Sequence, residues 1–411
     1  MSLEKYNSTL IELTSNKKGP VSTPICNSAS FGFGDSATGV ERFSGDLDNP
    51  QYSRMGNYTN LKLEQAFCAI EGGVRSYYLS SGMAAVSLAV MTLCKAGDEV
   101  LVVGGLFGGT YSFFSSFCAK CGIKAHFFEA DDYEKIEATI NGKTKLLFCE
   151  SVGNPNLKLT DIPRLAEITT RNGIALIVDN TVTPLSIKPI ELGADIVVYS
   201  TTKVLTGNSS ALGGVTIFRG LEEKNEKFLG ERYKSIVEKF LEKYPKDALA
   251  RSARPVMRDL GFVGNALASY LTLLGLETLA LRLECIKRNV PIVAKGLQEA
   301  GLNIRHPSLP NHEHHALYKG LYDGYVGTLL TIDCADREEA FSLLDNCKRV
   351  TITANICDNR TLGLHMASTI YKDYDDEAKS FLGITKGLVR VSIGLEAPED
   401  IIADFVQASK K

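Results

Sequence analysis

Short apolar runs alternate with longer amphipathic stretches along the middle of the chain. Five runs are apolar through their length, at residues 99–105, 144–150, 173–180, 194–200 and 213–220. Such runs are typical of strands buried on both faces, since neither face then carries polar side chains. Stretches with helical spacing, such as 132–142 and 162–173, lie between them. The pattern predicts an α/β fold with a mostly parallel central sheet flanked by helices.

The two ends of the chain have a different texture from this middle part. Residues 1–56 are rich in Gly, Ser, Asp and Asn and show little periodicity, which predicts an arm that becomes ordered against another surface. Residues 256–411 begin with long helical patterns and continue as mixed strands and helices, which predicts a smaller C-terminal α+β domain. Residues 57–255 are expected to form the main domain, with a charged helical insert on its surface at 224–247.

Composition and charge narrow the class of protein. The 411 residues are 44% hydrophobic and 23% charged, as in ordinary globular proteins, and the formal net charge is −3. This charge gives no pull toward nucleic acid or an anionic membrane. No apolar run reaches transmembrane length, and the N-terminus lacks the apolar core of a secretory signal, so we expect a cytoplasmic protein.

Cysteine and histidine patterns give no strong sign of a metal or disulfide. The ten cysteines are spread along the chain, many inside apolar runs, which suits reduced and buried thiols. Cys118 and Cys121 form a lone CxxC pair, which is weak evidence for redox or metal chemistry. The histidines at 312, 314 and 315 have no cysteine at metal spacing nearby, so a solvated loop is expected and no metal site is predicted.

Polar side chains with complementary chemistry follow the predicted strands. Parallel strands bring their carboxyl ends to one edge of the sheet, where ligands bind in folds of this class. The groups expected to gather there are Ser80, Ser81, Gly82, Phe107, Glu150, Asn154, Asp179, Ser200, Thr202 and Lys203. The turn at Ser81 and Gly82 precedes a helix, and a helix N-terminus with free N–H groups suits a phosphate.

One cofactor matches this whole set, pyridoxal 5′-phosphate (PLP). Its aldehyde needs a lysine amine for a Schiff base, and its pyridine nitrogen needs a carboxylate to stay protonated. Its phosphate needs N–H and O–H donors, and its ring accepts an aromatic stack. Lys203, Asp179 and Phe107 supply the lysine, the carboxylate and the aromatic ring.

Several motifs in the same order resemble the Cys/Met-metabolism family of PLP enzymes, which has fold type I. They are YSRMGN, SSGMAA, FGGTY, ESVGNPNL, VDNT, STTK, GLETLALR and LVRVSIGLE, and the resemblance spans roughly residues 20 to 410. It implies that Lys203 forms the Schiff base and that Asp179 pairs with the pyridine nitrogen. The other implied cofactor-binding residues are Tyr52, Arg54, Ser81, Gly82, Met83, Phe107, Asn154, Ser200 and Thr202.

The resemblance also implies substrate contacts and an assembly. Arg390 is expected to clamp the substrate carboxylate, and Asn355 stands where a serine often helps to bind substrate. Tyr52 and Arg54 are expected to reach the cofactor phosphate of a neighbouring subunit, which gives the N-terminal arm a role. The family is typically a homotetramer built from paired dimers.

Within the family, the motifs ESVGNPNLKLTDI, ARPVMRDLG and NICDNRTLGLHMAST are most similar to the O-acetylhomoserine sulfhydrylase branch. This implies γ-replacement on an O-activated homoserine by sulfide or a thiol, giving homocysteine or methionine. The alternative is a C–S γ-lyase that releases 2-oxobutanoate and ammonia from methionine, homocysteine or cystathionine, although Gly109 replaces the cysteine usual in methionine γ-lyases. A PLP-binding protein with little catalysis is a third reading.

The departures from the family pattern fall mainly on the substrate side. Phe107 replaces the usual stacking tyrosine, so the stack is kept while the phenol, a proton donor, is lost. The Gly-His that usually follows the lysine is replaced by VLTGNSS, and Asn355 replaces the usual serine. We therefore expect an intact cofactor site combined with an altered substrate side.

Overall fold

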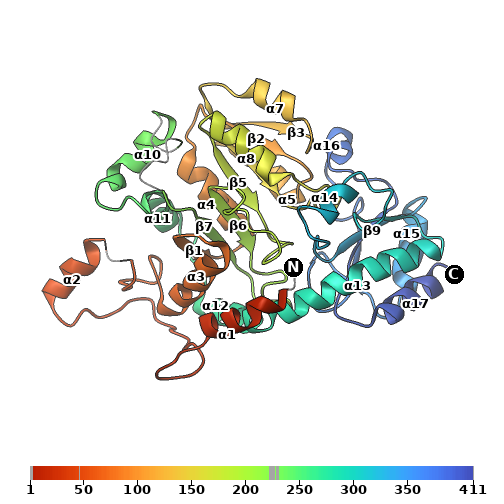
Figure 1. The fold of residues 1–411 in the computed structure, drawn as a ribbon, viewed down its shortest axis with the longest axis horizontal. Coiled ribbons are helices and arrows are strands. Elements are labelled where there is room, and N and C mark those ends of the chain that lie inside the picture. The colour runs from red at the N-terminus through yellow and green to blue at the C-terminus, as the bar shows by residue number, and fades with distance from the viewer. Residues whose placement is uncertain (1–2, 46, 222–226, 228–230, 411) are drawn as a thin grey trace.

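The computed structural model describes residues 3–45, 47–221, 227 and 231–410, and it has two sheets (Figure 1). The larger sheet has seven strands in the order β1-β7-β6-β5-β4-β2-β3. Its strands are β1 (Arg75–Leu79), β2 (Glu99–Val103), β3 (Lys124–Phe128), β4 (Thr144–Glu150), β5 (Ala175–Asp179), β6 (Ile196–Ser200) and β7 (Gly214–Phe218).

The large sheet is mostly parallel, as the sequence predicts. Strands β6, β5, β4, β2 and β3 run parallel to one another, while β7 is antiparallel to both β1 and β6. Four of the five predicted strands, β2, β4, β5 and β6, are neighbours in the sheet and parallel, so their carboxyl ends lie side by side. Strands β1 and β3 were not among the predicted apolar runs; β3 is only half-buried and carries Lys124 and His126, which break the apolar pattern.

Successive side chains of each central strand enter two different cores, because residues alternate between the faces of a strand. In β5, Leu176 and Val178 join one core, and Ala175 and Ile177 join the other. Helices α3 and α8 belong to the first core, and α4 and α11 belong to the second. The helices of this half are α3 (Tyr58–Glu71), α4 (Gly82–Leu93), α5 (Gly108–Ser112), η2 (Phe113–Phe117), α6 (Cys118–Lys120), α7 (Tyr133–Thr139), α8 (Ile162–Arg171), α10 (Glu231–Leu241) and α11 (Ala248–Leu260).

Two long helices lead into the smaller half of the molecule. These are α12 (Ala266–Glu277) and α13 (Leu279–Glu299), and Figure 1 shows α13 running under the second sheet. That sheet has the order β10-β11-β12-β9-β8, with strands β8 (Ile304–Arg305), β9 (Leu329–Asp333), β10 (Thr351–Ile352), β11 (Leu362–His365) and β12 (Leu388–Ser392). The remaining helices here are α14 (His315–Lys319), α15 (Arg337–Asn346), α16 (Asp376–Phe381) and α17 (Pro398–Ala408).

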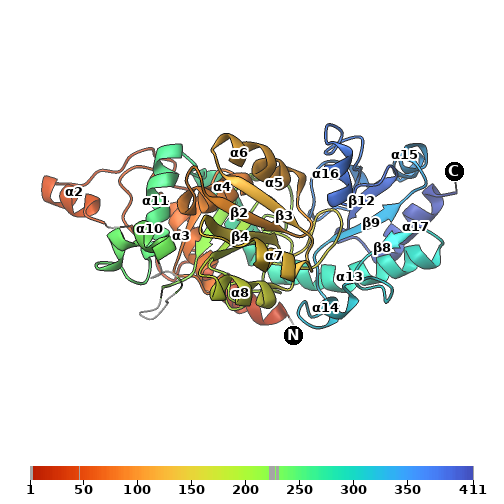
Figure 2. The same ribbon diagram turned by 90° about the horizontal axis from the view of Figure 1, so that it is seen from above.

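The N-terminal arm has two parts with different surroundings. Helices η1 (Leu3–Lys5) and α1 (Tyr6–Thr14) pack against α13 and α12, and Leu10 is fully buried there. The segment around α2 (Ser36–Phe43) instead projects away from the body of the molecule, as Figures 1 and 2 both show. It exposes large apolar side chains, including 69% of Val40 and 67% of Phe43.

The proposed division at residues 255 and 256 places its boundary inside α11, and the division into three parts stays a prediction. Helix α10 lies within the predicted insert at 224–247, whose residues 224–226 and 228–230 lie outside the described part. Within the described ranges, no single helix has both the length and the apolar character of a membrane span. Helices α12 and α13 meet those criteria only as a pair, which is bent by 60°.

We predict that Gly275→Ala destabilises the protein, although glycine-to-alanine changes inside helices usually stabilise. A Cβ at Gly275 in α12 would lie 2.3 Å from the carbonyl oxygen of Leu205 and 2.8 Å from Thr206 Cα. Because both contacts are backbone, α12 would have to shift, at a cost of about 1–3 kcal/mol. Denaturant titration measures this change.

Gly142→Ala is the matched control, since a Cβ at Gly142 would meet nothing within 4 Å. Its free energy of unfolding should change by no more than about 0.5 kcal/mol. A stabilised Gly275→Ala protein would contradict the close packing of α12 on the 205–206 backbone.

Candidate active site

A cavity of about 200 Å³ lies at the carboxyl ends of β4, β5 and β6, where the sequence places the complementary groups. Its walls come from both halves of the molecule, because Ala354, Ile356 and Arg390 belong to the smaller half. Ten of the predicted site residues line it, namely Ser81, Gly82, Met83, Phe107, Asn154, Asp179, Ser200, Thr202, Lys203 and Arg390.

The N-terminus of α4 forms one wall. Ser81 is the N-cap, and its hydroxyl accepts a hydrogen bond from the amide of Ala84. The amides of Gly82 and Met83 lie in the first turn, whose N–H groups have no acceptor inside the helix. A Cβ at Gly82 would lie 2.8 Å from Ser200 Cβ, so glycine is needed for this close approach. The wall therefore offers amide donors beside the Ser200 side chain, which suits a phosphate group.

Two carboxyl groups lie at adjacent strand ends. Glu150 of β4 is in register with Asp179 of β5. Removal from water raises the pKa of Asp179 to about 6, against hydrogen bonds from the Thr181 amide and hydroxyl. Burial also raises the pKa of Glu150, and the Asp179 charge raises it further. A cationic ring nitrogen beside Asp179 would relieve this cost, because an opposite charge favours the carboxylate.

Thr181 connects the ends of β5 and β6. Its hydroxyl donates to Asp179 Oδ1 at 2.6 Å and accepts from the Ser200 amide at 2.8 Å. The carboxylate of Asp179 is thereby fixed relative to the turn that carries Lys203. Thr181 was not among the predicted site residues, although it ends the VDNT motif that contains Asp179.

Lys203 lies in the turn that follows β6. Burial lowers the pKa of its amine; the thiol of Cys357 opposes this shift, and the positive charge of Arg390 adds to it. A lowered pKa increases the share of neutral amine, which is the nucleophilic form. The Nζ atom donates to Oδ1 of Asn355, so the structure places this predicted substrate residue against the lysine.

Arg282 of α13 stabilises the turn after Lys203 through hydrogen bonds to its backbone. Its guanidinium donates to the carbonyl oxygens of Val204, Leu205 and Gly275. Burial lowers the pKa of Arg282 to about 10. Sequence reasoning noted the GLETLALR motif that contains Arg282 but assigned the side chain no role.

Phe107 and Arg390 both line the cavity, and different hydrogen bonds hold each of them in place. Phe107 donates its amide to Glu150 Oε1 at 2.7 Å, and a Cβ at Gly109 would lie 2.7 Å from the Phe107 ring. Arg390 is 2% exposed, and burial lowers its pKa to about 10. Its guanidinium donates to Asn154 Oδ1 at 3.1 Å and to the carbonyl oxygen of Ala354 at 3.1 Å.

Tyr52 and Arg54 do not line this cavity. Arg54 donates to the carbonyl oxygen of Arg258 at 3.0 Å, and its guanidinium lies 5.6 Å from the ring centre of Tyr52. Tyr52 is 42% exposed. Among the described cavity-lining residues, the cationic side chains are Lys203 and Arg390.

The residues at the cavity fit PLP. The α4 amides and nearby hydroxyls suit its phosphate, Asp179 suits its pyridine nitrogen, Lys203 suits its aldehyde, and Phe107 supplies an aromatic ring. Glycine at position 82 suits this fit, because a Cβ there would lie 2.8 Å from Ser200 Cβ and push the α4 amides away from the hydroxyls.

Comparison with known proteins agrees with this fit. A homocysteine/cysteine synthase of Saccharomyces cerevisiae is 35% identical, with 94% of this chain and 92% of that protein covered. An O-acetyl-L-homoserine sulfhydrylase of Corynebacterium glutamicum is also 35% identical, with 93% and 91% covered.

A solved structure and a family model give the same result. The structure is a putative O-acetylhomoserine (thiol)-lyase of Campylobacter jejuni that contains N′-pyridoxyl-lysine-5′-monophosphate. It superposes with a TM-score of 0.90 at 31% identity and covers 98% of this chain and 100% of that one. The model of the Cys/Met metabolism PLP-dependent enzymes matches residues 8–410. The predicted fold class and family are confirmed, and the chain belongs to the Cys/Met metabolism family of PLP-dependent enzymes.

Proposed function

We propose that the protein catalyses γ-replacement on an O-activated homoserine, in which sulfide or a thiol displaces the γ-substituent to give homocysteine or methionine. The observation that carries this proposal is the cavity that joins Asp179, Lys203 and Arg390. Relatives named homocysteine synthase and O-acetylhomoserine sulfhydrylase support the reaction class. PLP, when bound, supplies an electron sink for negative charge on the substrate α-carbon.

The side chains divide the work according to their positions. Gly82, Met83, Ser200 and Thr202 hold the phosphate through amides and hydroxyls, and Asp179 keeps the pyridine nitrogen protonated. Each donor belongs to the backbone or to a short side chain, so these groups would restrict the orientation of a bound cofactor.

Lys203 and Arg390 act on the substrate. Lys203 would hold the cofactor aldehyde, and its free amine would take the proton from the substrate α-carbon, which its lowered pKa favours. Arg390 binds the substrate carboxylate, because a planar guanidinium can donate two parallel hydrogen bonds. The hydrogen bonds from this guanidinium to Asn154 and to the Ala354 carbonyl fix its orientation.

The alternative is a C–S γ-lyase, and a PLP-binding protein with little catalysis is a third possibility. A Cβ at Gly109 would lie 2.7 Å from the Phe107 ring, so the cysteine usual in methionine γ-lyases would require that ring to move from its present position. The cytoplasmic location expected from the sequence stays a prediction.

The decisive experiment incubates the purified protein with O-acetyl-, O-succinyl- and O-phosphohomoserine, with and without sulfide. Homocysteine that forms only with sulfide supports the sulfhydrylase. Ammonia and 2-oxobutanoate from methionine, homocysteine or cystathionine would support the lyase, and a yellow but inert protein would support the binding role. Lys203→Ala should stop turnover and abolish the Schiff-base absorbance, whereas Lys120→Ala, at an exposed lysine, should change neither.

We predict that Phe107→Tyr raises γ-elimination of a poor leaving group by roughly one to three orders of magnitude, because the phenol adds a general acid beside the ring. Steady-state kinetics with a poor and a good leaving group measure the effect. The good leaving group is the internal control, since it needs less protonation. Equal rates for both variants with the poor leaving group would show that another group donates the proton.

We further propose that the arm completes the site of a second chain within a homotetramer of paired dimers. A phosphate dianion removed from water needs compensating positive charge. The wall around Gly82 offers only neutral donors, while Arg54 lies outside its own cavity on an arm with exposed apolar side chains. We therefore expect the arm to become ordered by packing on a second chain.

Mixed oligomers test this assembly. We predict that Lys203→Ala and Arg54→Ala are each strongly impaired alone, and that activity returns when the two variants are unfolded together and refolded as a mixture. In a mixed oligomer, one site receives Lys203 from one chain and Arg54 from the other. Each variant refolded alone is the control. No recovery in the mixture, despite mixed oligomers in native mass spectrometry, would contradict the exchange of arms.

A further inference from the structure

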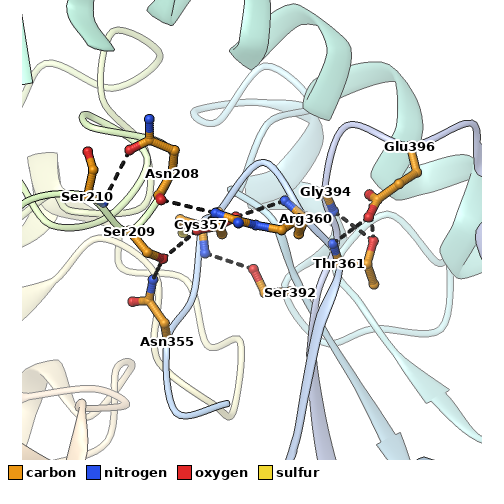
Figure 3. A network of polar contacts seen from close by, with 11 residues as sticks. Asn208, Ser209, Ser210, Asn355, Cys357, Arg360, Thr361, Ser392, Gly394 and Glu396 are labelled. Atoms are coloured by element: carbon orange, nitrogen blue, oxygen red, sulfur yellow. Dashed lines mark hydrogen bonds and ion pairs between the residues drawn. The ribbon is translucent and has the colours of Figure 1, made fainter. Parts of the chain in front are cut away.

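A row of hydrogen bonds connects two loops (Figure 3), and one of its members, Asn355, also contacts Lys203. One loop, residues 208–210, follows the turn that carries Lys203, and the other, residues 355–361, precedes and enters β11. Ser209 joins them, because its hydroxyl lies 2.5 Å from Asp358 Oδ2 and 2.8 Å from Asn355 Nδ2. Asn355 in turn accepts from Lys203 Nζ through Oδ1.

The charge on Asp358 determines which group donates and which accepts in the hydrogen bonds that run from Asp358 through Ser209 and Asn355 to Lys203. Burial opposes its ionisation, but hydrogen bonds from Arg360 and Ser209 keep its pKa below the ordinary value. Arg360 donates to both carboxylate oxygens, through Nε at 2.7 Å and Nη2 at 3.2 Å. An ionised carboxylate can only accept, so the Ser209 hydroxyl must give its single proton to Asp358.

The Ser209 oxygen is then left with acceptor capacity only. It must face the NH₂ group of Asn355, which turns the carbonyl oxygen of that amide toward Lys203. The two ends of an asparagine amide have nearly the same shape, so packing alone does not select one of them. The charge of Asp358, transmitted through one hydroxyl, selects the NH₂ end for Ser209 and so leaves the carbonyl end for Lys203.

The backbone at Ser209 points to a use for its side chain. Its φ angle is 59°, in the left-handed region that glycine adopts without steric cost. Arg360 anchors the same loop, since its Nη2 donates to the carbonyl oxygen of Asn208 at 3.0 Å. A glycine at position 209 would satisfy the backbone but would remove the hydroxyl from between Asn355 and Asp358.

We propose that Ser209 is a positioning residue that fixes the polarity of the Asn355 amide, so that a carbonyl oxygen and not an NH₂ group faces the Lys203 amine. An amine carries hydrogens in both protonation states, so a carbonyl acceptor holds it in place. If the Asn355 amide were inverted, its NH₂ group would face the N–H bonds of the Lys203 amine, and this would disfavour the ammonium form of the lysine. Ser209 thereby keeps Lys203 oriented whenever the lysine is not bonded to the cofactor.

The inference rests on the proposed role of Lys203, but its test needs no turnover. The full-length protein, stripped of cofactor, is treated with trace acetic anhydride over a pH series, and mass spectrometry measures acetylation of Lys203. The midpoint of this profile reports the pKa of the amine. Ser209→Gly should lower the midpoint by about 0.5 to 1 unit, the size of one ordinary intramolecular hydrogen bond. Thermal unfolding of Ser209→Gly should not fall below wild type, because glycine suits the φ angle.

Other ionisable groups near the lysine are unchanged in these variants. Arg390 and Cys357 affect its pKa, and Asp179 and Glu150 line the same cavity. Ser210→Ala is the matched control, since it removes the adjacent hydroxyl on the same loop, and its midpoint should equal wild type.

Asn355→Ala completes a double-mutant cycle. Without the amide there is no polarity to fix, so Asn355→Ala and the Asn355→Ala, Ser209→Gly double variant should share one midpoint. An unchanged midpoint in Ser209→Gly, or the same shift with and without Asn355, would overturn the inference. If Ser209→Gly shifts the acetylation midpoint of Lys203 but the wild-type protein has no γ-replacement activity, the proposed function is refuted and the role of Ser209 stands.

Discussion

The removal of several ionisable groups from water at one edge of a parallel sheet is the constraint on which the site depends. One cavity is lined by Asp179, Glu150, Lys203 and Arg390. Burial raises the pKa of the two carboxyl groups and lowers the pKa of the lysine and the arginine, so it favours the neutral form of each. Such groups are tolerated only when hydrogen bonds or opposite charges compensate them. The neighbours of the cavity supply part of this compensation, and a bound cofactor with a cationic ring nitrogen and an anionic phosphate would supply more.

Most of that compensation comes from the backbone and from short side chains. Thr181 fixes Asp179 to the start of the Lys203 turn, and Arg282 binds the carbonyl oxygens at the end of the same turn. The turn is therefore held from both sides before the lysine meets any ligand. Gly275 belongs to the same arrangement, because only a residue without a Cβ lets α12 approach Leu205 closely.

The sequence predicted the strand ends well, because buried parallel strands are apolar throughout and their carboxyl ends converge by topology. It could not show that Asn355 bonds Lys203, because the two residues are 152 positions apart and meet only through packing of the two halves. Thr181 and Arg282 were missed for a related reason. A hydroxyl or a guanidinium acquires its role from the backbone groups that the fold brings to it, and no local pattern records these.

The two halves of the molecule contribute different parts of the site. The phosphate donors and Asp179 come from the large sheet, whose register fixes them together, so a change at one would disturb the others. Arg390, in β12, and Asn355, in the loop before β11, come from the smaller half; Arg390 lines the cavity and Asn355 bonds Lys203. Substitutions there can change how substrate and lysine are held without loss of the cofactor. Asn355, from the smaller half, and Ser209, from the larger half, meet at the Lys203 amine, which must serve the cofactor and the substrate in turn.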